Sequence, residues 1–345
     1  MEKEELRKFA DDTINWLLYS KICSKEGDVY SWANPKKPGY RYPEIMGYYI
    51  KLLSYLFKNF GDEKYLNKAL ISADNLSNEL LIDGSVGKNG LKYVFDSAIC
   101  FSGLIALSKV TSLENNHKVA LKKTIDFFYN SMKEKKAIFK DGQDITNLNI
   151  WSSSYGSLLI KNTIALMEAY EYYKDNKFKT LAESITHELV SQSFRNNHFS
   201  VNSKHSFVYT HCHCYATEGL IYLISKGYDE FTPLVFKSSQ WLADNQNDDG
   251  SLFNWYLRDN VDRDKQGDAT AQATRIWLLT DKEKFKDNIN KSTLFLKSLQ
   301  NHDGGLYYNV NSKGIRSEDI NTWVTIFTIQ AILWQLEKPE RGWIV

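Results

Sequence analysis

The sequence predicts an all-α fold built from six copies of a two-helix unit. Amphipathic segments alternate along the chain with segments that are apolar on nearly every side. The apolar segments begin near residues 43, 95, 154, 211, 268 and 319, so they recur about every 55 residues. No such unit can bury its apolar helix alone, so all six must stack on one another. We therefore expect a single domain over residues 1–345.

The amphipathic segments are predicted outer helices. In the segment 63–81, leucine and alanine recur at steps of three and four residues, with polar residues opposite them. This is the pattern of a surface helix with one buried face. Similar segments lie near 4–20, 116–134, 177–194, 230–245 and 283–299.

The apolar segments are predicted inner helices. They are rich in small residues, and a helix that is apolar all round is buried. They span 43–58, 95–109, 154–173, 211–226, 268–280 and 319–336.

The connections between helices differ in length. Inner-to-outer connections such as 59–62 are short, whereas outer-to-inner connections are long and rich in aromatic residues. Antiparallel alternation places all long loops at one end of the fold, and long loops often carry function. Several begin with an Asp-Gly pair, whose glycine permits a left-handed turn after the outer helix. These pairs lie at 83–84, 141–142, 249–250 and 303–304, with a degenerate copy in 194–202.

Six outer and six inner antiparallel helices with Asp-Gly turns resemble an (α/α)6 toroid. This barrel is shared by six-hairpin glycosidases, toroidal polysaccharide lyases and sugar 2-epimerases, and the resemblance covers nearly the whole chain. The segment GDEKYLNKALISADNL (61–76) is similar to outer helices of sugar-active toroids. The segments QNDDGSLF (246–253) and LQNHDGGLYY (299–308) resemble, more weakly, the repeats of terpenoid cyclases. The resemblance implies an active hollow at the end that bears the long loops.

Acids and aromatics gather where the predicted inner helices begin. Carboxylates can act as acid and base in sugar hydrolysis, and aromatic faces stack on sugar rings. Several members are spaced by four residues and so share one helix face. The candidate catalytic residues are Glu44, Asp96, His211, Tyr215, Asp268 and Asp319. The candidate substrate-binding residues are Trp32, Arg41, Tyr42, Tyr48, Trp151, Tyr155, Trp255, Tyr256, Gln272 and Trp323. The competing interpretation is that the aspartates cap helices and the aromatics fill the core.

The segment YTHCHCYATEGL (209–220) is the densest in reactive side chains. His211 and Tyr215 share a helix face, and the resemblance to toroidal lyases and epimerases implies proton transfer by such residues. A second interpretation is zinc held by His211 and Cys214. Lanthionine cyclases are toroids with such a site, but their flanking Cys-Gly and Cys-His-Gly motifs are absent. The third is a structural histidine among buried thiols. We expect no metal and no cofactor. His211 is the leading candidate for a catalytic residue.

Composition excludes several partners. The net charge of +1 offers no global field for nucleic acid or an anionic membrane. No apolar run is long enough to span a membrane. The 4 cysteines form no disulfide framework, which favours a cytoplasmic protein. The sequence does not indicate an oligomeric state.

The sequence thus predicts a glycoside hydrolase or a polysaccharide lyase with a carbohydrate substrate. An arginine can bind a carboxylate through two hydrogen bonds. Arg41 in a long loop therefore makes an acidic glycan a further expected substrate. The alternatives are a sugar epimerase or isomerase of the same fold, a non-catalytic glycan- or peptide-binding toroid, and a terpenoid-cyclase-like enzyme. The acid motifs of terpenoid cyclases are absent, as are phosphate-loop and nucleophile-elbow motifs.

Overall fold

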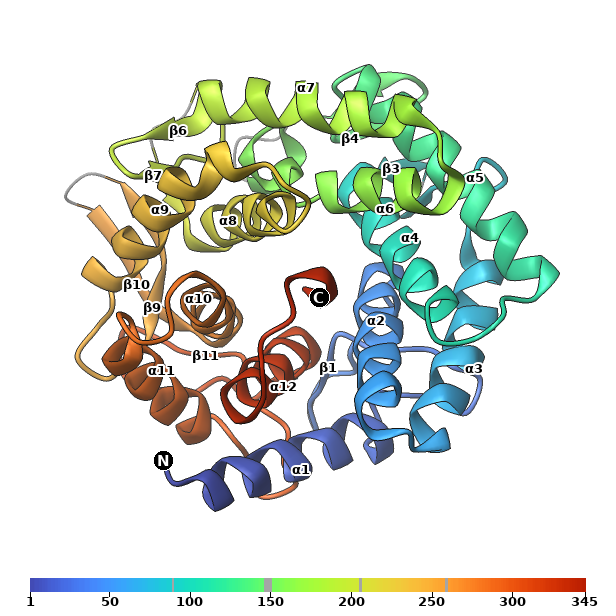
Figure 1. Ribbon diagram of the computed structural model, residues 1–345. Helices are drawn as coiled ribbons and strands as arrows, with labels where there is room; N and C mark the ends of the chain where they lie inside the picture. The colour runs from blue at the N-terminus through green and yellow to red at the C-terminus, as the bar shows by residue number, and fades with distance from the viewer. Residues whose placement is uncertain (89, 146–150, 205–206, 258–259) are drawn as a thin grey trace. The chain divides into compact units, whose positions relative to one another are not determined.

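The computed structural model describes residues 1–88, 90–145, 151–204, 207–257 and 260–345. Twelve α-helices lie in this part of the chain (Figure 1). Residue contacts divide the chain into two compact units. Unit 1 comprises residues 1–23, 30–40 and 193–345, and unit 2 comprises residues 24–29 and 41–192.

Unit 2 contains three helical hairpins. Helix α4 packs between α2 and α6, with α3 against α2 and α5 against α4. The helices are α2 (Pro43–Phe60), α3 (Glu63–Glu79), α4 (Val94–Ser108), α5 (Asn115–Lys133), α6 (Thr163–Tyr173) and α7 (Asn176–Ser193). The loops form an antiparallel sheet of order β2-β3-β4-β5, with strands β2 (Val86–Lys88), β3 (Leu91–Tyr93), β4 (Ile138–Lys140) and β5 (Gln143–Asp144).

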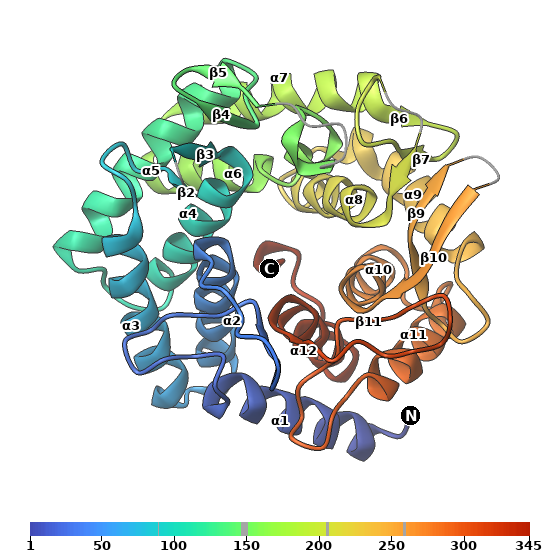
Figure 2. The ribbon, with the colours of Figure 1, turned by 180° about the vertical axis from the view of Figure 1, so that it is seen from behind.

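Unit 1 repeats this arrangement. Helix α10 lies between α8 and α12, and α9, α11 and α1 cover α8, α10 and α12 respectively (Figure 2). These helices are α1 (Lys3–Tyr19), α8 (Thr210–Ile224), α9 (Thr232–Asp244), α10 (Gly267–Thr280), α11 (Lys286–Ser298) and α12 (Thr322–Leu336). The inner members, α8, α10 and α12, are buried along almost their whole length.

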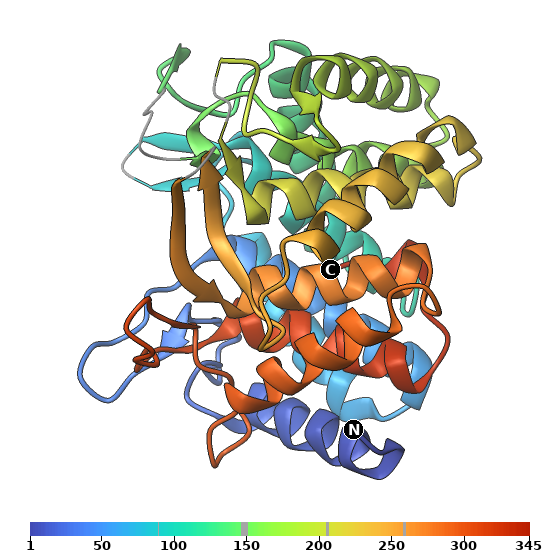
Figure 3. The same ribbon diagram turned by 90° about the vertical axis from the view of Figure 1, so that its left-hand side faces the viewer.

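The loops of unit 1 form short antiparallel sheets. The largest has the order β11-β10-β9-β8, and its β9–β10 hairpin stands at the end of the unit where α10 begins (Figure 3). Its strands are β8 (Val208–Tyr209), β9 (Leu252–Leu257), β10 (Asn260–Gln266) and β11 (Asn309–Val310). Two further pairs are β1 (Trp32–Ala33) with β12 (Ile320–Asn321), and β6 (Phe194–Arg195) with β7 (His198–Phe199).

Two predicted inner helices begin later than expected. The third starts at Thr163 rather than at 154, and the preceding chain forms the 3-10 turns η1 (Trp151–Ser153) and η2 (Ser157–Ile160). Serine and glycine are poor helix formers, and they dominate 152–157. The sixth starts at Thr322, because Asn321 caps it by accepting from the Val324 N–H at 3.0 Å. Asp319 therefore lies outside the helix. The prediction that Asp319 and Trp323 share one helix face is wrong.

The Asp-Gly turns have the predicted left-handed glycines, and three of them dock on a neighbouring helix. Gly84, Gly250 and Gly304 have φ of 85°, 88° and 103°. A β-carbon at these positions would lie 2.1–2.3 Å from backbone atoms of Lys123 in α5, Lys291 in α11 and Asp12 in α1. Each turn thus packs directly on the backbone of another outer helix, and only glycine fits both the conformation and the space.

We expect Gly250→Ala to lower the free energy of unfolding by about 2–4 kcal/mol, as strain at positive φ adds to overpacking. The control is Gly314→Ala, since Gly314 also has positive φ (77°) but no atom within 4 Å of an added β-carbon. Its expected loss is about 1 kcal/mol. Urea denaturation of both variants measures the difference, and equal losses would show that the docking contact is not tight.

One hydroxyl in each of three inner helices connects the helix to the Asp-Gly turn that precedes it in the chain. Ser97, Thr270 and Thr325 each donate to the carbonyl four residues earlier at 2.6–2.7 Å. Each also accepts the backbone N–H two residues after the turn glycine at 3.0–3.3 Å. These residues occupy the same place in α4, α10 and α12, the fourth residue of the helix. The repeat therefore extends to individual hydrogen bonds.

Candidate functional site

A buried carboxyl lies at the start of α4 in unit 2. Asp96 is the third residue of the helix and only 8% exposed. The hydroxyl of Tyr42, the residue that precedes α2, donates to Asp96 Oδ2 at 2.5 Å. Burial raises the pKa of Asp96 to about 6, and the Tyr42 hydrogen bond opposes this rise. Asp96 can therefore hold a proton close to neutral pH.

A second buried carboxylate lies in α2, the helix that packs on α4. Glu44 is in the first turn of α2 and is buried like Asp96. Cys100, one turn after Asp96, donates to the Pro43 carbonyl at 3.3 Å. Burial, and then the charges of Asp96 and Glu44, raise the pKa of the Cys100 thiol. Both predicted acids of unit 2 thus lie near one thiol.

The remaining predicted residues of unit 2 differ in surroundings. Tyr48 is fully buried in α2. Tyr155 is half-buried, and burial followed by the charge of Glu188 raises the pKa of its phenol. Trp151 begins η1, but its side chain lies outside the described residues.

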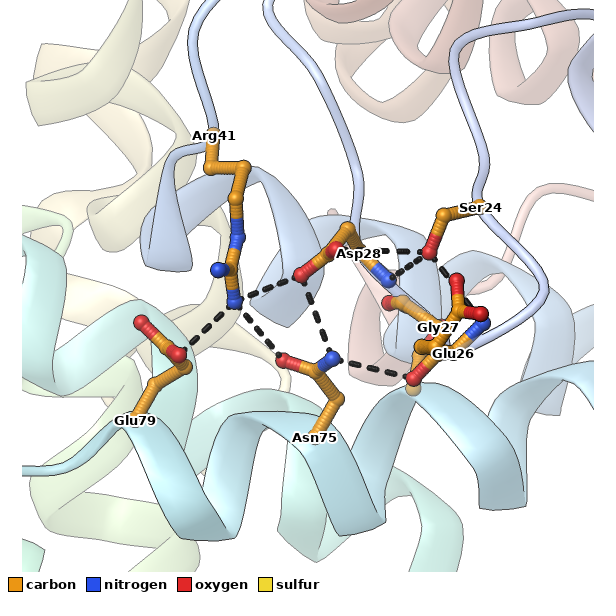
Figure 4. Close-up of polar contacts among 8 residues, drawn as sticks. Ser24, Glu26, Gly27, Asp28, Arg41, Asn75 and Glu79 are labelled. Carbon is orange, nitrogen blue, oxygen red and sulfur yellow. Dashed lines mark hydrogen bonds and ion pairs between the residues drawn. The ribbon is translucent and has the colours of Figure 1, made fainter.

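Arg41 is engaged in the scaffold of unit 2. Its Nη2 atom lies 2.6 Å from Asp28 Oδ1 and 2.7 Å from Glu79 Oε1 (Figure 4). Asn75 joins the same group, because its amide donates to Asp28 Oδ1 at 3.1 Å and its oxygen faces Arg41 Nη2 at 3.4 Å. The guanidinium thus holds the loop 24–28 on α3 and does not present a free grip for a substrate carboxylate.

His211 lies in the first turn of α8 in unit 1. Its ring centroid is 4.3 Å from that of Tyr215 and 6.2 Å from that of Phe327 in α12. Burial lowers the pKa of His211, and the charges of Asp268 and Glu218 only partly oppose this. The imidazole is therefore neutral at neutral pH.

Asp268 lies in the first turn of α10, half-buried. Its backbone neighbour Gly267 donates to the Tyr308 carbonyl at 3.0 Å. Burial raises the pKa of Tyr308 and Tyr209, and the charge of Asp268 adds to the rise in both. Both phenols thus stay protonated beside a carboxylate. This combination can exchange hydrogen bonds with sugar hydroxyls.

Trp255 and Tyr256 are adjacent in β9 but have different partners. Trp255 lies directly opposite Tyr209 in β8 and Asp262 in β10. Tyr256 packs on Trp241 of α9 at 5.2 Å between ring centroids, and burial raises its pKa to about 12. Tyr256 thus fills the space between sheet and helix, whereas Trp255 forms an aromatic and acidic row with its cross-strand neighbours.

The other predicted residues of unit 1 lie elsewhere in the unit. Trp32 contacts Tyr40 edge-on at 5.0 Å, and Lys37 Nζ lies 4.9 Å over its ring. Asp319 accepts from Asn34 at 2.6 Å and pairs with Lys37 at 2.9 Å. Trp323 is half-buried in α12. Asp319 is therefore tied to the 30–40 loop.

The second histidine of the Cys/His segment has a structural place. His213 is the fourth residue of α8, the position that Ser97, Thr270 and Thr325 occupy in their helices. Its Nδ1 accepts the Phe199 N–H at 3.0 Å, and its Nε2 lies 3.2 Å from the Ser238 carbonyl oxygen. Among the described residues, no three His, Cys, Asp or Glu side chains are grouped for a metal. His213 thus replaces the hydroxyl of the repeat.

We expect acid to destabilise the protein through His213. Burial lowers its pKa to about 3, against about 6.5 in an unfolded chain. The stabilisation is complete above the unfolded pKa and is lost as the pH falls towards 3, by up to about 1.4 kcal/mol per pH unit. Urea denaturation at several pH values measures this slope. His213→Thr should flatten it, and an unchanged slope would assign the acid sensitivity to other groups.

A buried ionic network adjoins His211 and was not predicted. Glu218 and Arg275 form a 2.5 Å ion pair with both side chains 0% exposed. Gln272, predicted to bind substrate, instead donates to the other oxygen of Glu218 at 3.2 Å and is fully buried. The sequence contains a signal for this ion pair, because Glu218 and Arg275 each lie in an otherwise apolar helix, where a charged side chain must be paired.

The chain is similar in structure to sugar-active enzymes. A sugar epimerase from a ruminal bacterium matches with a TM-score of 0.76 and 13% identity, over 96% of this chain and 99% of that one. The cellobiose 2-epimerase of Bacillus thermoamylovorans gives the same score and identity, over 96% and 100%. An unsaturated glucuronyl hydrolase specific for heparin gives a TM-score of 0.73 and 12% identity, over 96% and 97%.

These likenesses confirm the predicted all-α (α/α)6 toroid fold. No protein-family model matches the sequence, and no curated protein is significantly similar to it. No helix in the described ranges is long and apolar enough to cross a bilayer. The assignment of residues 1–345 to one domain stays a prediction.

Proposed function

We propose that the chain is a carbohydrate-active enzyme that hydrolyses a glycosidic bond, with Asp96 as the proton donor. The observation that carries this is the buried carboxyl of Asp96, hydrogen-bonded to Tyr42 at 2.5 Å, with a pKa of about 6. Glycoside hydrolysis requires a carboxyl group that holds its proton near the working pH and delivers it to the leaving oxygen.

The second carboxylate of the reaction is Glu44 in this proposal. It is buried in the first turn of α2 and acts, with Asp96, on the same thiol of Cys100. Such a carboxylate either attacks the anomeric carbon or activates a water. Solved structures of similar fold include an unsaturated glucuronyl hydrolase, which supports hydrolysis as the reaction.

The proposal is tested with a panel of oligosaccharides and polysaccharides, analysed by mass spectrometry for products that have gained one water. Appearance of ultraviolet-absorbing unsaturated products would indicate elimination and a lyase instead. Arg41 takes no part in the proposal, since its guanidinium is held by Asp28 and Glu79.

The pH dependence of turnover follows from Asp96. Turnover should fall above about pH 6 as the proton donor is lost. The Tyr42 hydrogen bond lowers the pKa of Asp96, so Tyr42→Phe should move this falling limb to higher pH. Rates of the two enzymes between mildly acidic and alkaline pH measure the shift. A limb that stays in place or moves to lower pH would contradict the role of Asp96.

Epimerisation or isomerisation of a free sugar is the second candidate, and His211 favours it. A neutral imidazole beside Tyr215 and Asp268 is suited to remove a proton next to a sugar carbonyl. Solved structures of sugar epimerases have the same fold. Incubation of reducing sugars in deuterium oxide tests this, because proton abstraction exchanges carbon-bound hydrogen, and His211→Gln should abolish the exchange.

A further inference from the structure

The segment 341–345 packs into unit 1 against α10 and α12. We infer that Arg275 is a positioning residue for His211, connecting this segment on one side to the imidazole on the other. The inference rests on the proposed role of His211, and it assigns a function to a part of the chain that contains no candidate catalytic residue. The end of the chain lies beside α12 (Figure 1).

One glutamine forms two hydrogen bonds with this segment. Gln330 of α12 donates from Nε2 to the Trp343 carbonyl at 2.7 Å, and its Oε1 accepts the Val345 N–H at 3.2 Å. The side chain of Ile344 between them is buried. Arg341 adds a hydrogen bond to the Leu279 carbonyl at 2.9 Å. The segment is therefore fixed by polar contacts to two inner helices.

Arg275 also forms a hydrogen bond with this segment. Its Nη1 donates to Gln330 Oε1 and to the main-chain oxygen of Val345, both at 3.0 Å. Its Nη2 lies 2.5 Å from Glu218 Oε1. A planar guanidinium offers donors in a fixed fork. The guanidinium orientation that allows the hydrogen bond to Val345 therefore also determines the position of Glu218.

From Glu218 and Arg275, two contacts lead to His211. Gln272 donates to Glu218 Oε2 at 3.2 Å, and its amide also interacts with His211. The Phe327 ring lies 4.4 Å from the Arg275 guanidinium carbon and 6.2 Å from the His211 ring. The imidazole thus rests on groups whose own positions depend on Arg275.

The charges around His211 make this arrangement measurable. Asp268 and Arg275 face it from α10, and Glu218 and Tyr215 face it from α8. The two carboxylates favour the protonated imidazole, whereas Arg275 and burial oppose it. If the guanidinium is displaced from Glu218, the carboxylate acts on His211 without compensation, and His211 should bind its proton more tightly.

The test is the titration of the His211 ring followed by NMR, with the resonance assigned by its loss in His211→Gln. We expect Gln330→Met and Arg275→Lys each to increase the proton affinity of His211 at least threefold. Gln330→Met introduces no unpaired charge of its own, so it serves if Arg275→Lys does not fold. Unchanged titration in the folded variants would overturn the inference.

Glu168→Gln is the matched control. Glu168 forms a buried ion pair with Lys51 in unit 2 at 3.3 Å, and it is as deeply buried as Glu218. This variant should lose stability without moving the His211 titration, and a comparable shift would mean that general loosening is the cause. The titration needs no substrate. A chain without sugar activity would therefore refute the proposed function while this result still decides the role of Arg275.

Discussion

Replacing Glu218 by glutamine is expected to lower the free energy of unfolding by about 3–5 kcal/mol. Arg275 is fully buried, and Glu218 supplies its counter-charge at 2.5 Å. Loss of the carboxylate leaves a guanidinium in the protein interior without its side-chain counter-charge, whereas in the unfolded chain water solvates it. Urea denaturation followed by circular dichroism measures the change.

Glu318→Gln is the control for this prediction. Glu318 pairs with Lys36 at the same 2.5 Å, but the two side chains are 57% and 71% exposed. An exposed pair contributes less than about 1 kcal/mol, because water screens it in the folded state. If both variants lost the same small amount, the buried pair would not be a determinant of stability.

Asp96→Asn should reduce turnover of a glycosidic substrate by about 10²–10⁴-fold, the contribution of a positioned general acid. The change is nearly isosteric, and an amide oxygen can still accept the hydroxyl of Tyr42. The fold and the binding of substrate should therefore persist. Initial rates and the denaturation midpoint, measured on the same preparation, separate loss of chemistry from loss of structure.

Asp126→Asn provides a matched control in the same unit. Asp126 pairs with Lys122 within α5 and is exposed. Its replacement should leave turnover unchanged. A similar loss in both variants would mean that Asp96 acts through stability and not as a proton donor.

The helical repeat was predictable because it depends on the spacing of apolar residues within each helix. Helix α3 has its buried apolar residues Tyr65, Ala69, Ala73 and Leu76 spaced by three and four positions. The third inner helix departed most from the prediction, since serine and glycine before Thr163 favour 3-10 turns over a continuous helix. Hydrophobic pattern alone does not distinguish these two states in a buried segment.

The sheets in the long loops were not predicted. Tyr209 and Trp255 are far apart in sequence, yet they face each other across β8 and β9. The pairing depends on β8, which has only two residues, too few to show an alternation. Consequently the separate surroundings of Trp255 and Tyr256 became visible only in the structure.

The contacts of the candidate site join distant helices. The sequence left open whether Asp96 caps α4, but the residue before that helix is Tyr93, and Asp96 instead accepts a hydrogen bond from Tyr42, the residue that precedes α2. A helix start is recognisable locally, whereas a hydrogen bond between two helices requires their packing. For the same reason the sequence offered Arg41 as a substrate ligand, although α3 supplies its ion-pair partner Glu79.

The most direct test of the central claim is the incubation of wild type and Asp96→Asn with a glycan panel, read by mass spectrometry. The proposed hydrolysis predicts at least one glycan cleaved by wild type with the gain of one water, and the same cleavage nearly lost in folded Asp96→Asn. Cleavage by the variant at the wild-type rate, or no sugar converted by wild type, would contradict it.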